Sequence, residues 1–248
     1  MTNKSLPGQF SMFLRSTLFI IVVPTFTIFY SMICVACFPF PLRTRFKVVM
    51  GWTRTVVWLL KVICHIDYHA VGYENIPQHR AGIVMSKHQS SWETFYLPYH
   101  FHETAIILKR ELTWVPFFGW GMAQCDPIAI NRSDGSSAMA QIMQQGKKYL
   151  EAGRWILMFP EGTRIAPGHV GKYKLGGARL AVETGSPIIP VAHNAGRYWS
   201  KRKFIKTPGT VKVVFGPPIE TKGRTAEDVM EETKNWIETT MLQIDGAL

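Results

Sequence analysis

His88 and Glu93 are the residues of this sequence best suited to proton transfer, and they lie in the stretch Ser86-Lys87-His88-Gln89-Ser90-Ser91-Trp92-Glu93. On one continuous helix the two side chains would point about 140° apart. If His88 instead lies in a turn and Glu93 in the first turn of a following helix, the carboxylate can reach the imidazole. A carboxylate bound to one ring nitrogen fixes the tautomer and leaves the other nitrogen free to act as a general base. The pair is therefore a candidate catalytic dyad.

The same stretch also has the spacing of a helix N-terminal capping box. In that motif Glu93 would accept a hydrogen bond from the backbone N–H of Ser90, three residues earlier. Capping boxes are common, so this stretch alone leaves both interpretations open.

The elements on either side decide where His88 is placed. Residues 81–85 form a short apolar run that predicts a buried strand, and residues 94–97 can continue a helix until Pro98. His88 is then expected in a strand-to-helix turn at the carboxyl end of a strand. Open α/β sheets bind their ligands at this end.

Two other polar groups follow predicted strands. Lys109 and Arg110 come directly after a strand expected at residues 103–108, and two adjacent cations can hold an anion. Glu161, Gly162, Thr163 and Arg164 come after a strand expected at residues 154–159. Such a turn exposes backbone N–H groups, and an arginine fork suits phosphate. The alternative for the second group is a tight turn with a solvated arginine.

The remaining periodic segments favour an α/β fold. Strands are expected at residues 125–130, 187–191 and 210–215, and helices at residues 133–152, 173–184 and from Thr225 onwards. Alternating strands and helices predict a mixed, largely parallel sheet flanked by helices, preceded by an N-terminal membrane-associated helical segment. The 248 residues are expected to divide into N-terminal membrane-anchoring helices at 1–66 and an α/β domain at 67–248.

The N-terminal segment has the composition of a membrane anchor. Residues 16–42 are uncharged and long enough for a transmembrane helix. The positive-inside rule places the rest of the chain in the cytoplasm, because four cations follow soon after: Arg43, Arg45, Lys47 and Arg54. Residues 45–66 predict an interfacial amphipathic helix with tryptophans at the headgroup level. The alternative is a half-submerged helical hairpin whose first arm is broken at Pro24.

The net charge of +11 predicts an anionic partner. Signatures of nucleic-acid-binding domains are missing, so a membrane surface or a phosphorylated substrate is expected and nucleic acid is not. Four cysteines supply neither a disulfide framework nor a metal-ligand cluster. A basic loop can lie in solvent or contact anionic headgroups or an acidic carrier, and its cations are Arg197, Lys201, Arg202, Lys203 and Lys206.

Four stretches, in order and spacing, resemble the bacterial 1-acylglycerol-3-phosphate acyltransferases of the glycerolipid acyltransferase superfamily. They are residues 88–93, 109–112 with 116–120, 159–164 and 188–191, and the resemblance covers roughly residues 80–195. The family usually has aspartate where this chain has Glu93. Glutamate keeps the carboxylate and extends its reach by one methylene group.

The resemblance implies transfer of a fatty acyl group from acyl-CoA or acyl carrier protein to the sn-2 hydroxyl of 1-acylglycerol 3-phosphate, giving phosphatidic acid. It implies that His88, oriented by Glu93, is the base, and that neither a metal nor a further cofactor takes part. The substrate-binding residues that it implies are Lys109, Arg110, Glu161, Gly162, Thr163 and Arg164. Backbone N–H groups near Gly162, or Lys109, are candidates for stabilising the oxyanion. An acyl-enzyme on Ser90 or Ser91 is disfavoured, because both serines occupy capping positions.

The resemblance also implies a bacterial inner-membrane protein with its catalytic domain on the cytoplasmic face. Its partners would be the lipid bilayer, lysophosphatidic acid and the acyl donor. Two other functions stay open at this point. One is an acyltransferase acting on another acceptor, either glycerol 3-phosphate or a lyso-aminolipid. The other is a non-catalytic membrane lipid-binding protein, which would have no use for a base and carboxylate pair.

Overall fold

The computed structural model describes residues 8–131, 133–201 and 203–246. Its centre is a seven-stranded sheet in the order β1-β7-β6-β2-β5-β3-β4. The strands are β1 (Ile66–Val71), β2 (Ile83–Ser86), β3 (Ala105–Lys109), β4 (Ile128–Ile130), β5 (Ile156–Met158), β6 (Ile188–His193) and β7 (Gly209–Phe215). Only the β6–β7 pair is antiparallel, so the predicted mixed, largely parallel sheet is confirmed. The mutually parallel β2, β3, β5 and β6 therefore end at the same edge.

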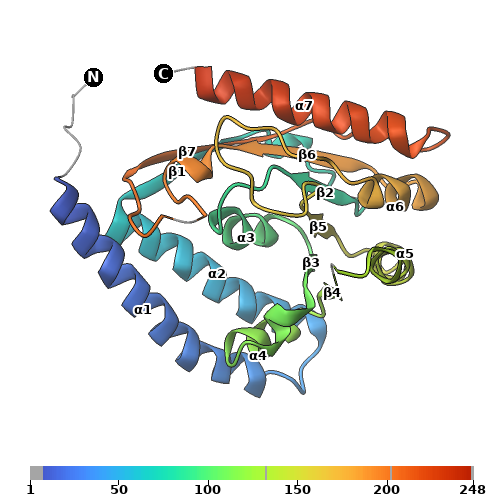
Figure 1. Cartoon of the computed structure of the whole chain (residues 1–248). Coiled ribbons are helices and arrows are strands. Elements are labelled where there is room, and N and C mark those ends of the chain that lie inside the picture. The colour runs from blue at the N-terminus through green and yellow to red at the C-terminus, as the bar shows by residue number, and fades with distance from the viewer. Residues whose placement is uncertain (1–7, 132, 202, 247–248) are drawn as a thin grey trace.

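Helices cover both faces of the sheet (Figure 1). They are α1 (Gln9–Ala36), α2 (Leu42–Cys64), α3 (Trp92–Tyr96), α4 (Phe118–Ala123), α5 (Gly135–Glu151), α6 (Gly176–Thr184) and α7 (Ala226–Gly246). Alternate strand residues face opposite layers. Val84 and Leu157 pack in the core shared with α2, whereas Ile83 and Ile156 pack in the core shared with α5 and α6.

Helix α1 runs through Pro24 without interruption, so the alternative of a first arm broken at Pro24 is wrong. A proline inside a helix removes one backbone hydrogen bond. Contacts before and after Pro24 hold α1 in place. Before it, the Phe19 ring lies 5.6 Å from the Trp199 ring, and after it, the Tyr30 hydroxyl donates to the Val48 carbonyl at 2.9 Å. Helix α1 therefore lies along the rest of the protein over most of its length.

Helix α2 packs on the sheet instead of lying only at a surface. Val56 and Leu60 are fully buried in the same core as β1 and β7, so residues 1–66 and 67–248 share one core. The expectation that the tryptophans of this helix lie at the headgroup level is wrong for Trp52. Its indole is buried, and Nε1 donates to the Thr27 hydroxyl at 3.0 Å. Trp58 is exposed.

The remaining predicted helices and strands all form, most of them with shifted starts. Strand β4 begins at Ile128, three residues later than expected, and β3 begins at Ala105, two residues later. Positive φ angles at Asp126 (50°) and Glu103 (44°) place turns just before these strands. Helix α7 begins as predicted, because the Thr225 hydroxyl accepts the backbone N–H of Asp228 at 3.1 Å.

Candidate active site

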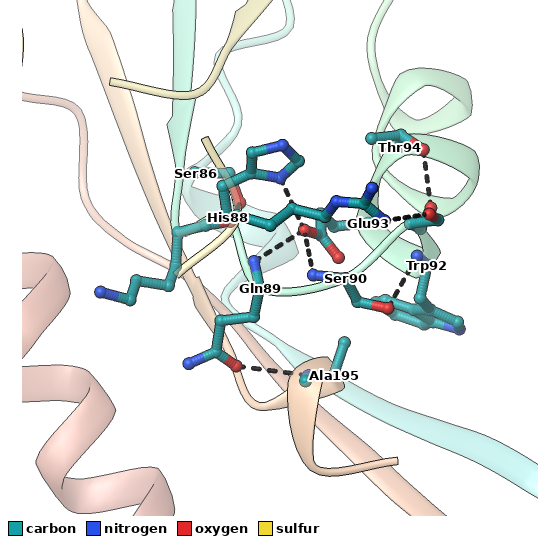
Figure 2. Close-up of polar contacts among 12 residues, drawn as sticks. Ser86, His88, Gln89, Ser90, Trp92, Glu93, Thr94 and Ala195 are labelled. Atoms are coloured by element: carbon teal, nitrogen blue, oxygen red, sulfur yellow. Dashed lines mark hydrogen bonds and ion pairs between the residues drawn. The ribbon is translucent and has the colours of Figure 1, made fainter. Parts of the chain in front are cut away.

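The carboxylate of Glu93 is the centre of the loop that follows β2 (Figure 2). Its Oε1 atom lies 2.9 Å from Nδ1 of His88 and accepts the backbone N–H groups of Gln89 and Ser90 at 2.9 and 2.8 Å. The bond from Ser90 is the one expected of a capping box. The two interpretations of this stretch are therefore compatible in part: one oxygen makes the Glu93 half of a capping box and also holds the imidazole, whereas α3 has Ser91 as its N-cap with no side-chain cap bond.

Glu93 is fully buried and remains ionised at neutral pH. Burial alone would raise its pKa, but the imidazoles of His193 and His88 and the backbone N–H of Ser90 outweigh burial and hold the pKa below its ordinary value. An ionised carboxylate can only accept hydrogen bonds, so the proton of neutral His88 is on Nδ1. The Nε2 atom of His88 then has its lone pair available for a substrate proton.

A second loop, residues 159–165 after β5, covers His88. The Phe159 ring stacks on the His88 imidazole, with ring centroids 4.1 Å apart and an interplanar angle of 19°. The backbone N–H of Ile165 donates to the His88 carbonyl at 2.8 Å. The two loops join because β2 and β5 are parallel neighbours that end at the same edge. An apolar cavity of about 150 Å³ lies beside this second loop, and Phe159, Met158 and Ile107 are among its lining residues.

Arg164 brings a cation to the His88 loop (residues 87–91). Its Nη1 donates to the Ser91 hydroxyl at 2.8 Å, and the residue is half-buried. Beside it, the Lys201 ammonium donates to the Thr163 hydroxyl at 3.0 Å, which links the basic loop to the same turn. Arg202, another cation predicted for that loop, lies outside the described residues. The turn at residues 162–164 thus contains one cation, Arg164, and contacts a second, Lys201.

Glu161 differs from the rest of its turn because its side chain is fully buried. One carboxylate oxygen, Oε2, accepts the backbone N–H of His88 at 2.9 Å, and the other, Oε1, lies 2.7 Å from the Lys87 ammonium. Both oxygens are engaged inside the protein. This geometry gives Glu161 a part in holding the His88 loop.

Lys109 and Arg110 lie at the same edge of the sheet, at the end of β3. Lys109 forms an ion pair with Glu111 at 3.2 Å, and the Arg110 guanidinium lies 5.6 Å from the centre of the Trp114 ring. Both cations are exposed. Within the described part of the chain, neither forms a hydrogen bond or an ion pair with the His88 loop.

His193, at the end of β6, is a site residue that the sequence analysis missed. It is fully buried, its Nε2 donates to the Lys87 carbonyl at 2.8 Å, and its Nδ1 accepts the backbone N–H of Ala195 at 3.3 Å. Burial lowers the pKa of His193, against the attraction of the nearby Glu93 carboxylate, and the ring holds the His88 loop from behind. The strand predicted at residues 187–191 ends at the same edge of the sheet as β2, and this was the available signal.

Comparisons with known proteins agree with this geometry. A family model described as acyltransferase matches residues 67–194, more than half of the chain. A 1-acyl-sn-glycerol-3-phosphate acyltransferase of Pseudomonas aeruginosa is 46% identical over 209 residues, covering 83% of this chain and 80% of that protein. The beta form of that enzyme from Homo sapiens is 30% identical over 202 residues, covering 79% of this chain and 71% of that protein.

A solved structure has the same fold. The crystal structure of the 1-acyl-sn-glycerophosphate (LPA) acyltransferase from Thermotoga maritima superposes with a TM-score of 0.81, and the match covers 95% of this chain and 96% of that one at 22% sequence identity. The His88 and Glu93 pair lies inside the matched family region, at the sheet edge where ligands of such folds bind. By the sequence relationships above, the chain belongs to the 1-acyl-sn-glycerol-3-phosphate acyltransferase family.

Proposed function

We propose that this protein transfers a fatty acyl group from a thioester donor, acyl-CoA or acyl carrier protein, to the sn-2 hydroxyl of 1-acylglycerol 3-phosphate, giving phosphatidic acid. The observation that carries the proposal is the 2.9 Å contact between His88 Nδ1 and the buried Glu93 carboxylate, with Arg164 beside the same loop. This arrangement supplies a base and a cation for a phosphate. The family relationship supports the choice of acceptor.

The reaction needs one proton acceptor that later returns its proton. His88 Nε2 takes the proton of the sn-2 hydroxyl while the hydroxyl oxygen attacks the thioester carbonyl carbon, and a C–O bond forms. The tetrahedral intermediate collapses, the C–S bond breaks, and the protonated Nε2 gives its proton to the departing thiolate. Glu93 holds the imidazole in the correct tautomer and stabilises the imidazolium formed in between.

Arg164 is the proposed partner of the acceptor phosphate, and the neighbouring Thr163 and Gly162 line the same turn. Lys109 and Arg110, at the end of β3, are proposed to contact the phosphate or the donor from the other side. Backbone N–H groups near Gly162, or the Lys109 ammonium, are proposed to stabilise the oxyanion.

The acceptor is tested by product analysis. The full chain, reconstituted in vesicles, would be given acyl-CoA or acyl carrier protein as donor and a panel of acceptors: 1-acylglycerol 3-phosphate, glycerol 3-phosphate and lyso-aminolipids. Mass spectrometry is expected to find phosphatidic acid as the main product. Preferred acylation of another acceptor, or no transfer at all, would overturn the proposed reaction.

Replacing Arg164 by alanine is expected to weaken acceptor binding. A charge-assisted hydrogen bond contributes about 1.5–3 kcal/mol, so the apparent KM for 1-acylglycerol 3-phosphate should rise roughly tenfold or more. The KM for the acyl donor should stay nearly constant in the same initial-rate measurement. An equal rise in both constants would assign Arg164 to the donor or to the fold.

The N-terminal helices indicate membrane association. Among the described residues one helix, α1, is long and apolar enough to cross a membrane. We propose that α1 instead lies in the plane of the bilayer, because the rest of the protein covers one side of it over most of its length. Its other side exposes large apolar residues: Phe10, Leu14, Ile21, Phe29 and Met32.

This orientation places the site next to the lipid. The Phe204 ring of the basic loop lies 5.3 Å from the Phe13 ring of α1, and Lys201 of the same loop contacts Thr163 of the site. A lipid acceptor then needs to move only slightly from the headgroup plane to meet His88. The cations at the start of α2 suit an anionic leaflet, which supports the cytoplasmic face of a bacterial inner membrane as the location.

Charged substitutions on the exposed side of α1 are expected to release the protein from vesicles. Ile21 and Phe29 are 60% and 70% exposed, so Ile21→Glu with Phe29→Glu leaves the core intact. Each large apolar side chain buried in lipid contributes about 1.5–3 kcal/mol, which predicts that vesicle partitioning weakens by about 10²-fold or more. High salt alone should not release the wild type, because salt does not screen apolar burial.

The matched control is Leu242→Glu on α7, across the sheet from α1, where the leucine is 75% exposed (Figure 1). Co-sedimentation with vesicles should be unchanged in this variant. Full retention of the α1 double variant on vesicles would contradict the in-plane placement.

A further inference from the structure

A buried lysine that takes no part in the proposed reaction lies directly before His88. Lys87 is 1% exposed, and its ammonium has three acceptors: Glu161 Oε1 at 2.7 Å, Glu238 Oε1 at 2.8 Å and the His169 carbonyl at 3.2 Å. An ammonium has three N–H donors, so every donor of Lys87 is used. The Lys87 side chain therefore has one well-defined position.

Hydrogen bonds connect the Lys87 side chain, through Glu161, to the backbone of the His88 loop. Glu161, whose Oε1 binds Lys87, accepts the backbone N–H of His88 through Oε2 at 2.9 Å. The Glu161 carboxylate is thus held at one end by the ammonium and holds His88 at the other. The backbone N–H of Gly171 adds a longer bond to Oε1 at 3.3 Å.

The other end of the network is on the C-terminal helix α7. Glu238 is 18% exposed, and its Oε1 accepts the Tyr173 hydroxyl at 2.7 Å as well as the Lys87 ammonium. Helix α7 packs on β6, across the sheet from α1 and α2 (Figure 1). It begins at Ala226, beyond the region that the family model matches.

A buried ion pair is an inefficient way to stabilise a fold, because apolar residues of similar volume often do as well or better. What such a network provides is a fixed geometry. General-base catalysis depends on that geometry, since a displacement of about 1 Å can cost about 10²-fold in rate.

We propose that Lys87, fixed by Glu238 of α7, is a positioning residue for the acyl transfer reaction. It acts through Glu161, whose carboxylate sets the backbone of His88 and thereby the direction of the imidazole. The proposal rests on the proposed function and adds to it a requirement for the C-terminal helix.

The test is the kcat of folded full-length variants in the vesicle assay, measured well below the Tm of each variant. Lys87→Met is expected to lower kcat by about 10–100-fold, with the KM of donor and acceptor changed by less than about threefold. Glu238→Ala should lower kcat in the same direction. Glu238→Gln should retain most of the activity, because its amide oxygen still accepts from Lys87 and Tyr173.

Arg154→Met is the matched control for loss of a buried cation. Arg154 is 5% exposed and forms an ion pair with Asp126 at 2.9 Å, before the start of β5 and so at the opposite edge of the sheet. This variant should lose thermal stability and keep the wild-type kcat. It separates a loss of stability from a loss of positioning.

A wild-type kcat in folded Lys87→Met, or in Glu238→Ala, would overturn the proposal, and so would a rise confined to the acceptor KM. If Lys87→Met does not fold, Glu238→Ala decides, because its side chain is partly exposed. The wild type in the same assay distinguishes failure of the proposed acyl transfer from failure of the positioning role of Lys87. No phosphatidic acid from the wild type contradicts the proposed function itself.

Discussion

Replacing His88 by alanine is expected to lower kcat by about 10²–10⁴-fold, the usual contribution of general acid–base catalysis. The imidazole is the only group on the His88 loop that is placed to take the hydroxyl proton, with Glu93 at 2.9 Å behind it. The KM values should change little, because the acceptor phosphate is proposed to bind through Arg164. Initial rates of the purified full chain on vesicle-presented 1-acylglycerol 3-phosphate measure the effect.

The control for this substitution is His102→Ala. The His102 side chain is 60% exposed and lies just before β3, at the edge of the sheet opposite the site. Its removal should leave kcat unchanged. A His88→Ala enzyme with near wild-type turnover would contradict the proposed mechanism.

Replacing Glu93 by glutamine is expected to lower kcat by about 10²-fold, the lower end of the range for general acid–base catalysis. Glutamine keeps the size of the side chain and can still accept hydrogen bonds from the loop. It loses the negative charge that fixes the His88 tautomer and stabilises the imidazolium, while the base itself remains. The loss should therefore be smaller than that of His88→Ala in the same rate assay.

Replacing Glu93 by aspartate distinguishes the effect of the negative charge from the effect of side-chain length. Aspartate keeps the charge but is one methylene shorter, and one oxygen of Glu93 receives His88, Gln89 and Ser90 together. The aspartate variant is expected to retain more activity than the glutamine variant. The reverse order would show that the hydrogen-bond geometry of the loop matters more than the charge.

The placement of the site could be predicted from the sequence because it depends on local patterns. A short apolar run before His88 and another before Glu161 predicted two strands, and parallel strands bring such ends together. The spacing of Ser90 and Glu93 predicted the bond between them, and the structure shows that this bond and the His88 contact use one oxygen.

Contacts between distant segments could not be predicted in this way. Nothing in the spacing of Lys87 and Glu238, 151 positions apart, indicates that they meet at 2.8 Å. Trp52 was misplaced for a similar reason: an amphipathic pattern predicts which side of a helix is apolar, but it does not distinguish a protein core from a membrane surface. Its partner Thr27 lies on a different helix.

In the proposed reaction His88 activates the acceptor hydroxyl for direct attack on the thioester. The most direct test is to mix the full chain with acyl-labelled acyl-CoA, with and without 1-acylglycerol 3-phosphate, and to measure both thiol release and label on the protein. The Ser90 hydroxyl accepts the Trp92 N–H at 3.2 Å and the Ser91 hydroxyl accepts from Arg164 at 2.8 Å, so both serines are engaged away from the base. Direct attack predicts thiol release only when the acceptor is present, and no labelled protein. A burst of thiol equal to the enzyme concentration without acceptor, with the acyl label on a serine, would contradict it.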